Sequence, residues 1–208
     1  MIGVIDYGAG NLGSVMNALA RLGCQARFVR DAEELYGKTR HFEKLIFPGD
    51  GHFATAMSSL SSLGYDSAIR DWIAQDRPFL GICIGLQLLF ESSEEAPPEN
   101  GQPVKGLSIL PGKVKLLPCR KVPQIGWNKT SAHSNSRLFS CFGEEEFLYY
   151  IHSYYAAPAQ PEDCAATANY AIDFCAAVER GALAAVQFHP EKSGGAGLRL
   201  LKNWLDLL

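Results

Sequence analysis

Short apolar runs alternate with amphipathic stretches through the first half of the chain. The apolar runs predict four strands, at residues 2–6, 25–29, 43–49 and 78–83. The amphipathic stretches predict four helices, at residues 11–23, 54–64, 66–76 and 84–91. This regular β-α-β-α alternation indicates an α/β fold with a mostly parallel, twisted sheet that is covered by helices on both faces.

The pattern changes between Ala96 and about Val122. A polar segment rich in Pro and Gly occupies residues 95–106 and predicts a loop. Strand-like pieces then follow at 113–118, 147–156 and 184–189, which indicate hairpins or a small antiparallel extension of the sheet. A terminal helix is expected at 194–208. Because no repeat or interdomain linker is visible, we expect residues 1–208 to form a single domain.

Composition narrows the classes of protein that fit this pattern. The 208 residues are 47% hydrophobic and 20% charged, with a net charge of −3, which is typical of a globular domain with a substantial core. Without a basic stripe, nucleic acid is not an expected partner. Without a long apolar run or a basic segment before one, neither a membrane span nor a signal peptide is expected.

The cysteines and histidines are scattered along the chain. The six cysteines are Cys24, Cys83, Cys119, Cys141, Cys164 and Cys175, and none of them forms a C-x-x-C pair. A chain of this size does not need disulfides, so reduced thiols and a cytoplasmic location are expected. His189 and Glu191 are the nearest approach to a metal-ligand cluster, and two residues alone do not predict a metal site.

A glycine-rich segment near the N-terminus raises a first functional hypothesis. Residues Gly8 to Gly13 read G-A-G-N-L-G, which matches the dinucleotide pattern G-x-G-x-x-G between a strand and a helix. Asp31 lies about where a ribose ligand is expected. A nucleotide-binding or structural protein with no turnover is therefore one interpretation of the chain.

Residues 79–87, FLGICIGLQ, suggest an enzyme instead. A strand runs through Gly81-x-Cys83-x-Gly85 directly into a helix, which is a nucleophile-elbow arrangement with Cys in place of Ser. Any Cβ at the two glycines would collide with neighbouring backbone in so sharp a turn. The helix N-terminus would favour the thiolate, and the Ile84 N–H would face a developing oxyanion. The alternative is a buried core cysteine, which we take for the other five.

A base and its orienting group are found late in the chain. A predicted strand brings His189 to its end, Pro190 breaks the strand, and Glu191 follows. Since residues i and i+2 of a strand point the same way, Glu191 can bind one imidazole nitrogen while the other faces the sulfur. A strand-end histidine with a satisfied hydrogen bond is the alternative. His52 and His152 are expected in walls of the same site.

Six segments in chain order resemble the class I (triad-type) glutamine amidotransferases. More narrowly, they resemble the family of glutaminase subunits of imidazole glycerol phosphate synthase. The segments are DYGAGNLGSV, FPGDGHF, GICIGLQLLF, PQIGWN, YYIHSYYA and VQFHPEKSG. The resemblance implies the flavodoxin-like fold of that class, a Cys83-His189-Glu191 triad, and no cofactor. It also implies that the Gly8–Gly13 turn carries no dinucleotide.

The resemblance implies further site residues. Backbone amides of Gly49, Asp50 and Gly51 would supply the second half of an oxyanion hole, although a plain turn is the alternative. The family usually has an aliphatic residue where this chain has Asp50, so this side chain must point away from the oxyanion or be paired. Gln87 would contact the glutamine substrate. Glu95 would hold its α-amino group, unless Glu94 and Glu95 are merely a solvated pair.

The implied activity is hydrolysis of L-glutamine to glutamate and ammonia, and the ammonia would pass to the partner in a heterodimer. The partner would be a (β/α)8-barrel cyclase of histidine biosynthesis, and Asn11, Tyr149 and Lys192 would lie near its interface. Core packing for Tyr149 and a solvated side chain for Lys192 are the alternatives. A glutaminase that serves the synthases for pyridoxal phosphate, anthranilate or purines is the rival within the same class.

Overall fold

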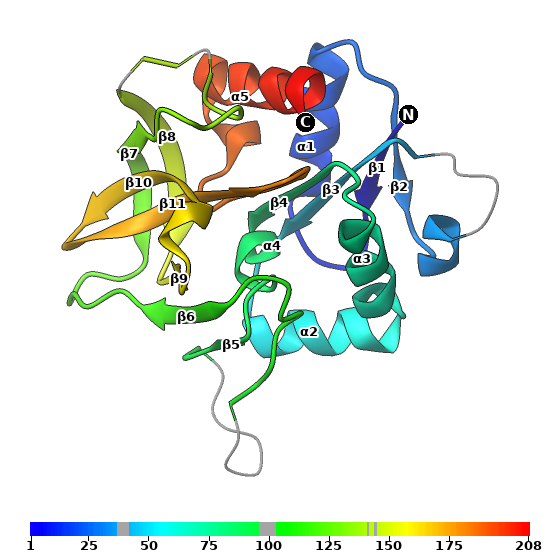
Figure 1. The fold of residues 1–208 in the computed structure, drawn as a ribbon, viewed down its shortest axis with the longest axis horizontal. Helices are drawn as coiled ribbons and strands as arrows, with labels where there is room; N and C mark the ends of the chain where they lie inside the picture. The colour runs from blue at the N-terminus through cyan, green and yellow to red at the C-terminus, as the bar shows by residue number, and fades with distance from the viewer. Residues whose placement is uncertain (37–41, 96–102, 141, 144) are drawn as a thin grey trace.

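The computed structural model describes residues 1–36, 42–95, 103–140, 142–143 and 145–208. Cys141 and most of the loop expected at 95–106 lie outside the described residues. Figure 1 shows a parallel half on the right, a strongly twisted antiparallel half on the left, and both chain ends on the upper side.

Five strands form the parallel half of the sheet, in the order β2-β1-β3-β4-β12. Each neighbouring pair in this row runs parallel. The strands are β1 (Ile2–Ile5), β2 (Ala26–Val29), β3 (Lys44–Gly49), β4 (Phe79–Cys83) and β12 (Leu183–Val186). This is the 2-1-3-4-5 order of flavodoxin-like sheets, whose ligands bind at the carboxyl ends of the strands. The predicted α/β class and its parallel sheet are confirmed.

The antiparallel half extends farther than the strand-like pieces of the sequence indicated. β11 (Ile172–Arg180) pairs antiparallel with β12, and the row continues through β10 (Cys164–Tyr170), β7 (Gln124–Ala132) and β8 (Glu145–His152). A branch adds β9 (Tyr154–Pro158), β6 (Gly112–Leu116) and β5 (Ser92–Ser93). Small residues dominate β10, which has the sequence CAATANY, so its pattern carries little strand signal.

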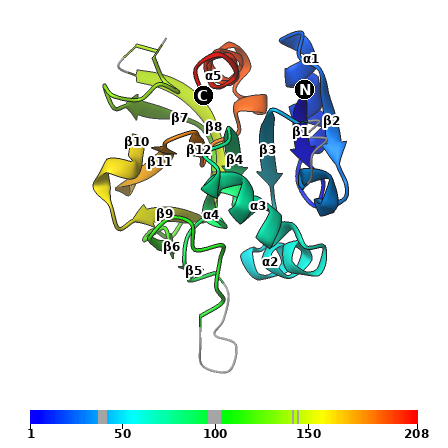
Figure 2. The same cartoon turned by 45° about the vertical axis from the view of Figure 1, so that its right-hand side comes forward.

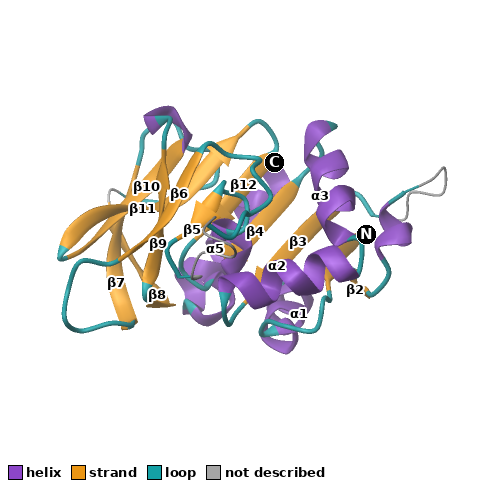
Figure 3. Cartoon of the chain, turned by 90° about the horizontal axis from the view of Figure 1, so that it is seen from below, coloured by secondary structure: helices purple, strands orange, loops and turns teal. Residues whose placement is uncertain are grey.

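Helices cover both faces of the parallel strands (Figures 2 and 3). α2 (Phe53–Ser62) and α3 (Tyr65–Ala74) bury Leu60 and Trp72 in one core. α1 (Leu12–Arg21) and α5 (Gly194–Leu207) bury Leu19 and Trp204 in the other. The described residues also form three short 3₁₀ helices: η1 (Ala32–Leu35), η2 (Pro161–Asp163) and η3 (Pro190–Lys192). Within the described part of the chain, no helix is both long enough and apolar enough to cross a bilayer.

The helix after β4 is much shorter than predicted. α4 covers only Ile84–Gln87, whereas the sequence indicated a helix over 84–91. The carbonyls that would continue the helix are bonded elsewhere, since those of Leu88 and Leu89 accept from the N–H groups of Leu107 and Ile109 at 2.7 and 2.8 Å. Residues 107–109 thus bind the carbonyls just after α4, and the helix ends there. A helix of one turn has a weaker dipole than the longer helix that the sequence predicted.

Candidate active site

Cys83 lies on a strained turn at the carboxyl end of β4. Its backbone has φ +56° and ψ −107°, a region that non-glycine residues rarely occupy. A Cβ at Gly81 would lie 2.7 Å from the Gly85 carbonyl oxygen, and one at Gly85 would lie 2.0 Å from that of Phe47. The expected collision at both flanking glycines is confirmed. Close packing around the turn therefore fixes the direction of the Cys83 side chain.

His189 is anchored three residues after β12 ends. Its N–H donates to the Tyr149 carbonyl at 2.8 Å, and its carbonyl accepts from the Ser193 hydroxyl at 2.7 Å. Ser193 Oγ also accepts from the Tyr149 N–H at 2.9 Å, so one buried hydroxyl joins β8 to the histidine. Sequence reasoning did not single out Ser193, because a serine after a proline-broken strand is an ordinary loop residue.

Glu191 reaches the imidazole by a different route from the one expected. His189 has extended backbone angles, but Pro190 starts η3, so Glu191 lies in a 3₁₀ turn and not two positions along a strand. Its Oε1 nevertheless lies 2.9 Å from His189 Nδ1. The two side chains are 5% and 2% exposed, so the pair is shielded from water. The strand argument was wrong in its geometry, although the two groups do meet.

The charge state of His189 depends on its two neighbours. Burial alone would lower its pKa, but the Cys83 sulfur and the Glu191 carboxylate outweigh burial and raise the pKa to about 10. Nε2 makes no hydrogen bond to any described residue. Catalytic hydrogen bonds are often longer before substrate binds. The arrangement thus supplies a histidine that can hold a proton beside a sulfur nucleophile.

A cavity of about 290 Å³ opens over these side chains. Most of the predicted site residues line it, namely Asp50, Gly51, Cys83, Ile84, Gln87, Glu95, His189 and Lys192. Its remaining lining residues are Pro123, Ile151, His152, Ser153 and Tyr154. Gly49, Glu191, Asn11 and Tyr149 are predicted site residues that lie outside the lining. His52 is also absent from it, because this exposed residue caps α2 by accepting from the Ala54 N–H at 3.2 Å.

Gln187 is a buried contact of the sulfur that the sequence did not indicate. Its Nε2 lies 3.6 Å from Cys83 Sγ, and its Oε1 accepts from Gln87 Nε2 at 3.1 Å. Gln87 Nε2 also donates to the Tyr154 carbonyl at 2.9 Å. Gln187 follows β12 and resembles a core residue of the predicted strand, so its sequence position gave no signal. Both donor contacts of the Gln87 amide are made within the protein.

Two carboxylates hold the Gly49–Gly51 loop and the start of α2. Asp50 Oδ1 accepts from the Gly10 N–H at 2.9 Å. Glu95 Oε2 accepts from the Phe53 N–H at 2.8 Å, at the first turn of α2. The Asp50 carboxylate is thus hydrogen-bonded, which agrees with the expectation that it must be paired if the loop forms an oxyanion site. Glu95 bonds the first residue of α2, two positions after the loop, and also lines the cavity.

His152 is a neutral histidine in the cavity wall. Its Nδ1 lies 2.8 Å from the Tyr154 carbonyl, which can only accept, so this nitrogen carries the proton. Burial lowers the pKa of His152 to about 4, and the nearby His189 also acts to lower it, against the opposing effect of the Tyr154 carbonyl. The expected place of His152 in the site wall agrees with this geometry.

Carboxylates occupy the glycine-rich turn that resembled a dinucleotide site. The Gly10 N–H donates to Asp50, and the Gly8 N–H donates to Asp6 at 3.3 Å. Asp31 caps η1 by accepting from the Glu33 N–H at 2.9 Å. Two negative side chains on these amides would repel a pyrophosphate. The tight turn therefore links loops of the protein and does not fit a dinucleotide.

The three predicted interface residues lie in different surroundings. Asn11 caps α1 by accepting from the Ser14 N–H at 3.4 Å. Lys192 is exposed at the rim of the cavity. Tyr149 packs edge-on against Trp127, with ring centroids 6.1 Å apart, on the outer face of the β7–β8 hairpin. Asn11 and Tyr149 thus have contacts within the chain, whereas Lys192 lies at the cavity rim.

The outer face of the β7–β8 hairpin forms an apolar patch next to the cavity. Cross-strand pairs place Ile125 beside Ile151 and Trp127 beside Tyr149, and Phe147 extends the row. Ile125, Trp127 and Phe147 are 62%, 55% and 60% exposed. Ile151 belongs both to this patch and to the cavity wall. So many large apolar side chains together on one face are typical of an interaction surface.

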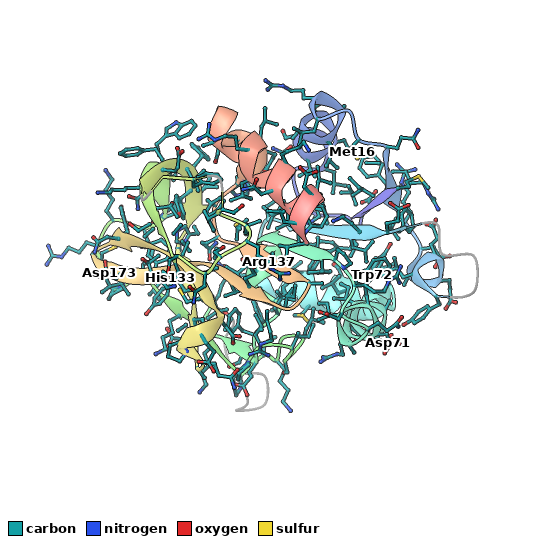
Figure 4. All side chains as sticks on the ribbon, turned by 45° about the horizontal axis from the view of Figure 1, so that its top comes forward. Met16, Asp71, Trp72, His133, Arg137 and Asp173 are labelled. Atoms are coloured by element: carbon teal, nitrogen blue, oxygen red, sulfur yellow. The ribbon has the colours of Figure 1, made fainter. Side chains whose placement is uncertain are left out.

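Other cavities show fewer features of a catalytic site. A hollow of about 260 Å³ on the antiparallel half includes His133 and Arg137, both labelled in Figure 4. Its Arg137 is already paired with Glu179 at 2.9 Å. Among the described residues, no group of three or more His, Cys, Asp or Glu side chains could hold a metal ion. The chemistry is therefore concentrated around Cys83.

Comparison with protein families gives a match over almost the whole chain. The model for "Glutamine amidotransferase class-I" matches residues 3–207. Imidazole glycerol phosphate synthase subunit HisH of Chlorobaculum tepidum is 44% identical over 99% of this chain and 100% of its own length. The HisH subunits of Dehalococcoides mccartyi and Geobacillus kaustophilus are 42% and 43% identical, over 100% of this chain and 97% of theirs.

Solved structures share the fold at lower identity. A structure described as a glutamine amidotransferase superposes with a TM-score of 0.74 at 21% identity, over 98% of this chain and 96% of that one. PurLQS from Thermotoga maritima gives the same TM-score and coverage at 17% identity. A glutamine amidotransferase from Thermotoga maritima gives 0.67 at 18%, over 98% of this chain and 80% of that one. These likenesses support the fold.

Proposed function

The chain belongs to the class-I glutamine amidotransferases, and from that premise we propose that Cys83, His189 and Glu191 hydrolyse L-glutamine to glutamate and ammonia. With 42–44% identity to HisH subunits over the full chain, it serves as the glutamine amidotransferase subunit of an imidazole glycerol phosphate synthase in histidine biosynthesis. The observation that carries the triad is the 2.9 Å contact of Glu191 with His189 beside a cysteine held at positive φ.

In the first step, the Cys83 sulfur attacks the side-chain amide carbon of glutamine. The proton of Cys83 is held on His189 Nε2, because a pKa of about 10 keeps the imidazole charged beside the thiolate. This nitrogen has no hydrogen-bond partner among the described residues. Glu191 holds Nδ1 and stabilises the charged imidazole, in agreement with the raised pKa of His189. His189 then gives the proton to the leaving nitrogen, ammonia departs, and a glutamyl thioester remains on Cys83.

The tetrahedral oxyanion needs donors on the other side of the carbon. The Ile84 N–H and one amide of the Gly49–Gly51 loop are the proposed pair, and each such donor is typically worth about 3–4 kcal/mol. Ile84 and Gly51 both line the cavity, and Gly49 is packed against Ile84. Water activated by His189 then cleaves the thioester and releases glutamate.

Glu95 and Gln87 are the proposed contacts for the rest of the substrate. The Glu95 carboxylate faces the cavity and suits the α-ammonium group of glutamine. Gln87 Nε2 is bonded within the protein, so its part in binding falls to its other side-chain atoms or to the shape of the wall.

The released ammonia calls for an acceptor close by. In bulk water at neutral pH it would become ammonium and lose its nucleophilicity. As a synthase subunit the chain has a partner, and we propose that this is a (β/α)8-barrel cyclase that makes imidazole glycerol phosphate and an aminoimidazole carboxamide ribotide. The apolar patch around Trp127 is its proposed docking face, because Ile151 connects this patch to the cavity. Asn11, Tyr149 and Lys192 are proposed to contribute to the same interface.

The domain organisation and the cellular location are also proposed. Residues 1–208 act as one glutamine amidotransferase domain, which the family match over 3–207 and the single continuous sheet support. A cytoplasmic location rests on the cysteines, of which the five within the described residues are free thiols.

The test measures ammonia release by the chain alone, by its complex with the cyclase, and by the complex with the cyclase ribonucleotide bound. We expect a nearly silent chain that the loaded complex activates, since uncoupled turnover wastes glutamine. Lys192→Ala should weaken this activation more than it weakens glutamine binding.

Cys83→Ala should abolish ammonia release, while the complex still forms and still makes product from ammonium salts at high pH. Cys119→Ala is the control, because this half-buried thiol lies outside the cavity lining. Persistent turnover in Cys83→Ala would show that the nucleophile is another group. Equal ammonia release by the wild-type chain alone, by the complex and by the ligand-bound complex would favour a free-standing glutaminase.

A further inference from the structure

Tyr7 carries a buried hydroxyl that bonds to no described residue. The side chain follows β1 and is 3% exposed, and its Oη has no hydrogen-bond partner in the described part of the chain. Two other buried tyrosines are satisfied, since Tyr65 donates to the Val29 carbonyl at 2.8 Å and Tyr150 lies 2.6 Å from the Thr130 hydroxyl. Buried polar groups are nearly always paired, so the Tyr7 hydroxyl needs an explanation.

The hydroxyl lies against the oxyanion loop. A Cβ built on Gly49 would be 2.6 Å from Tyr7 Oη and 3.0 Å from the Ile84 Cβ. Tyr7, Gly49 and Ile84 therefore meet at one point, between the two backbone segments that carry the proposed oxyanion donors. The ring is fixed there by packing against Phe47, with centroids 5.4 Å apart. Tyr7 does not line the cavity, so it cannot act by touching the substrate.

The hydroxyl remains a proton donor under all working conditions. Burial is the main cause that raises the pKa of Tyr7 above its usual value, and the charges of Asp50 and Cys83 raise it further. A neutral phenol beside a glycine backbone can donate one hydrogen bond to a peptide carbonyl. The Gly49 carbonyl is a candidate acceptor, because its carbon is bonded to the same Cα as the Cβ that would lie 2.6 Å from the hydroxyl.

We propose that Tyr7 is a positioning residue. Its hydroxyl donates a hydrogen bond to the backbone carbonyl of Gly49 when the Gly49–Asp50 peptide turns its N–H toward the oxyanion. This inference rests on the proposed function. A rotating peptide moves its N–H and C=O in opposite directions, so an N–H that enters the cavity sends the carbonyl toward the packed side of the loop. Glycine at position 49 permits this rotation and leaves room for the hydroxyl. With Tyr7 in place, the carbonyl finds a donor on that side of the loop and is not buried alone.

The test replaces Tyr7 by Phe in the complex with the cyclase partner and its ligand. Ammonia release should show a kcat lower by about 10-fold, with the KM for glutamine changed by less than 2-fold, because the active loop arrangement loses one hydrogen bond. Thermal stability should stay equal or rise, since the resting chain loses only an unpaired hydroxyl. Alkylation of Cys83 by iodoacetamide, which forms no oxyanion, should keep its wild-type rate.

Tyr65→Phe is the matched control. It removes a buried hydroxyl that is bonded to Val29 and lies outside the cavity, so it should lower stability and leave kcat unchanged. A wild-type kcat in Tyr7→Phe would overturn the inference, and so would a parallel fall in the iodoacetamide rate. Failure of the proposed function is distinct, because then the wild-type complex itself would release no ammonia or Cys83→Ala would remain active.

Discussion

The Asp50 carboxylate accepts a hydrogen bond from the backbone N–H of Gly10 at 2.9 Å, which ties the loop after β3 to the loop after β1. Asp50 also lines the cavity that contains Cys83. A single side chain therefore places a negative charge in the cavity wall and restrains the loop that is proposed to supply one donor to the oxyanion.

Removing the Asp50 charge is expected to raise the glutaminase rate of the chain without its partner. Asp50→Asn keeps an acceptor for Gly10 and should increase kcat several-fold, as expected for one charge some distance from the reacting atoms. Asp50→Val also removes the tie and should give the larger increase. Ammonia release by each variant, alone and in the complex, measures this. Unchanged rates in both variants would mean that Asp50 influences neither the charge nor the loop.

Substitutions of His189 and Glu191, the two partners of Cys83 in the proposed triad, are expected to lower kcat by different factors. His189→Ala should lower kcat by about 10²–10⁴-fold, because it removes the group that moves the proton. Glu191→Gln should cost less, since Glu191 orients the imidazole through its 2.9 Å contact and transfers no proton. Steady-state ammonia release compares the two variants. Wild-type activity in Glu191→Gln would remove it from the triad.

Acid should destabilise the protein partly through His152. Its pKa is about 4 when folded and 6.5 when unfolded, so the unfolded chain binds the proton first as pH falls. The contribution of neutral His152 to the free energy of unfolding is fully present above pH 6.5 and is lost as the pH falls toward 4. The total loss is roughly 3 kcal/mol. Denaturant unfolding at pH 7 and pH 5 should show a smaller loss for His152→Asn than for wild type. The exposed His133→Asn is the control and should match wild type; an equal loss in all three would contradict the assignment.

Trp127 is expected to dominate the docking face. It is 55% exposed in the centre of the apolar patch and packs edge-on against Tyr149, so Trp127→Ala should weaken binding of the cyclase partner by at least about 10-fold. The variant should fold normally, because the side chain lies on the outer face of the hairpin. Calorimetry with the purified partner gives the dissociation constant. Leu63→Ala, which truncates an exposed apolar side chain at the end of α2, should bind as wild type.

Sequence alone determined the features that local sterics and periodicity control. The alternation of apolar runs and amphipathic stretches predicted the parallel strands and their helices, because each element must bury one face. Gly81 and Gly85 marked the turn at Cys83, since no other residue fits where a Cβ would meet the carbonyls of Gly85 and Phe47. Ordered motifs then indicated the family.

Tertiary structure decided everything that depends on which loops meet. The chain after Gln87 leaves its helix because residues 107–109 take the carbonyls of that segment. Glu191 reaches His189 from a 3₁₀ turn, Gln187 touches the Cys83 sulfur, and Tyr7 lies over Gly49. These contacts join residues from different strand ends or depend on a local turn. The sequence pattern of a single segment cannot predict such contacts, because these residues become neighbours only when the parallel sheet forms and brings the ends of its strands to one edge.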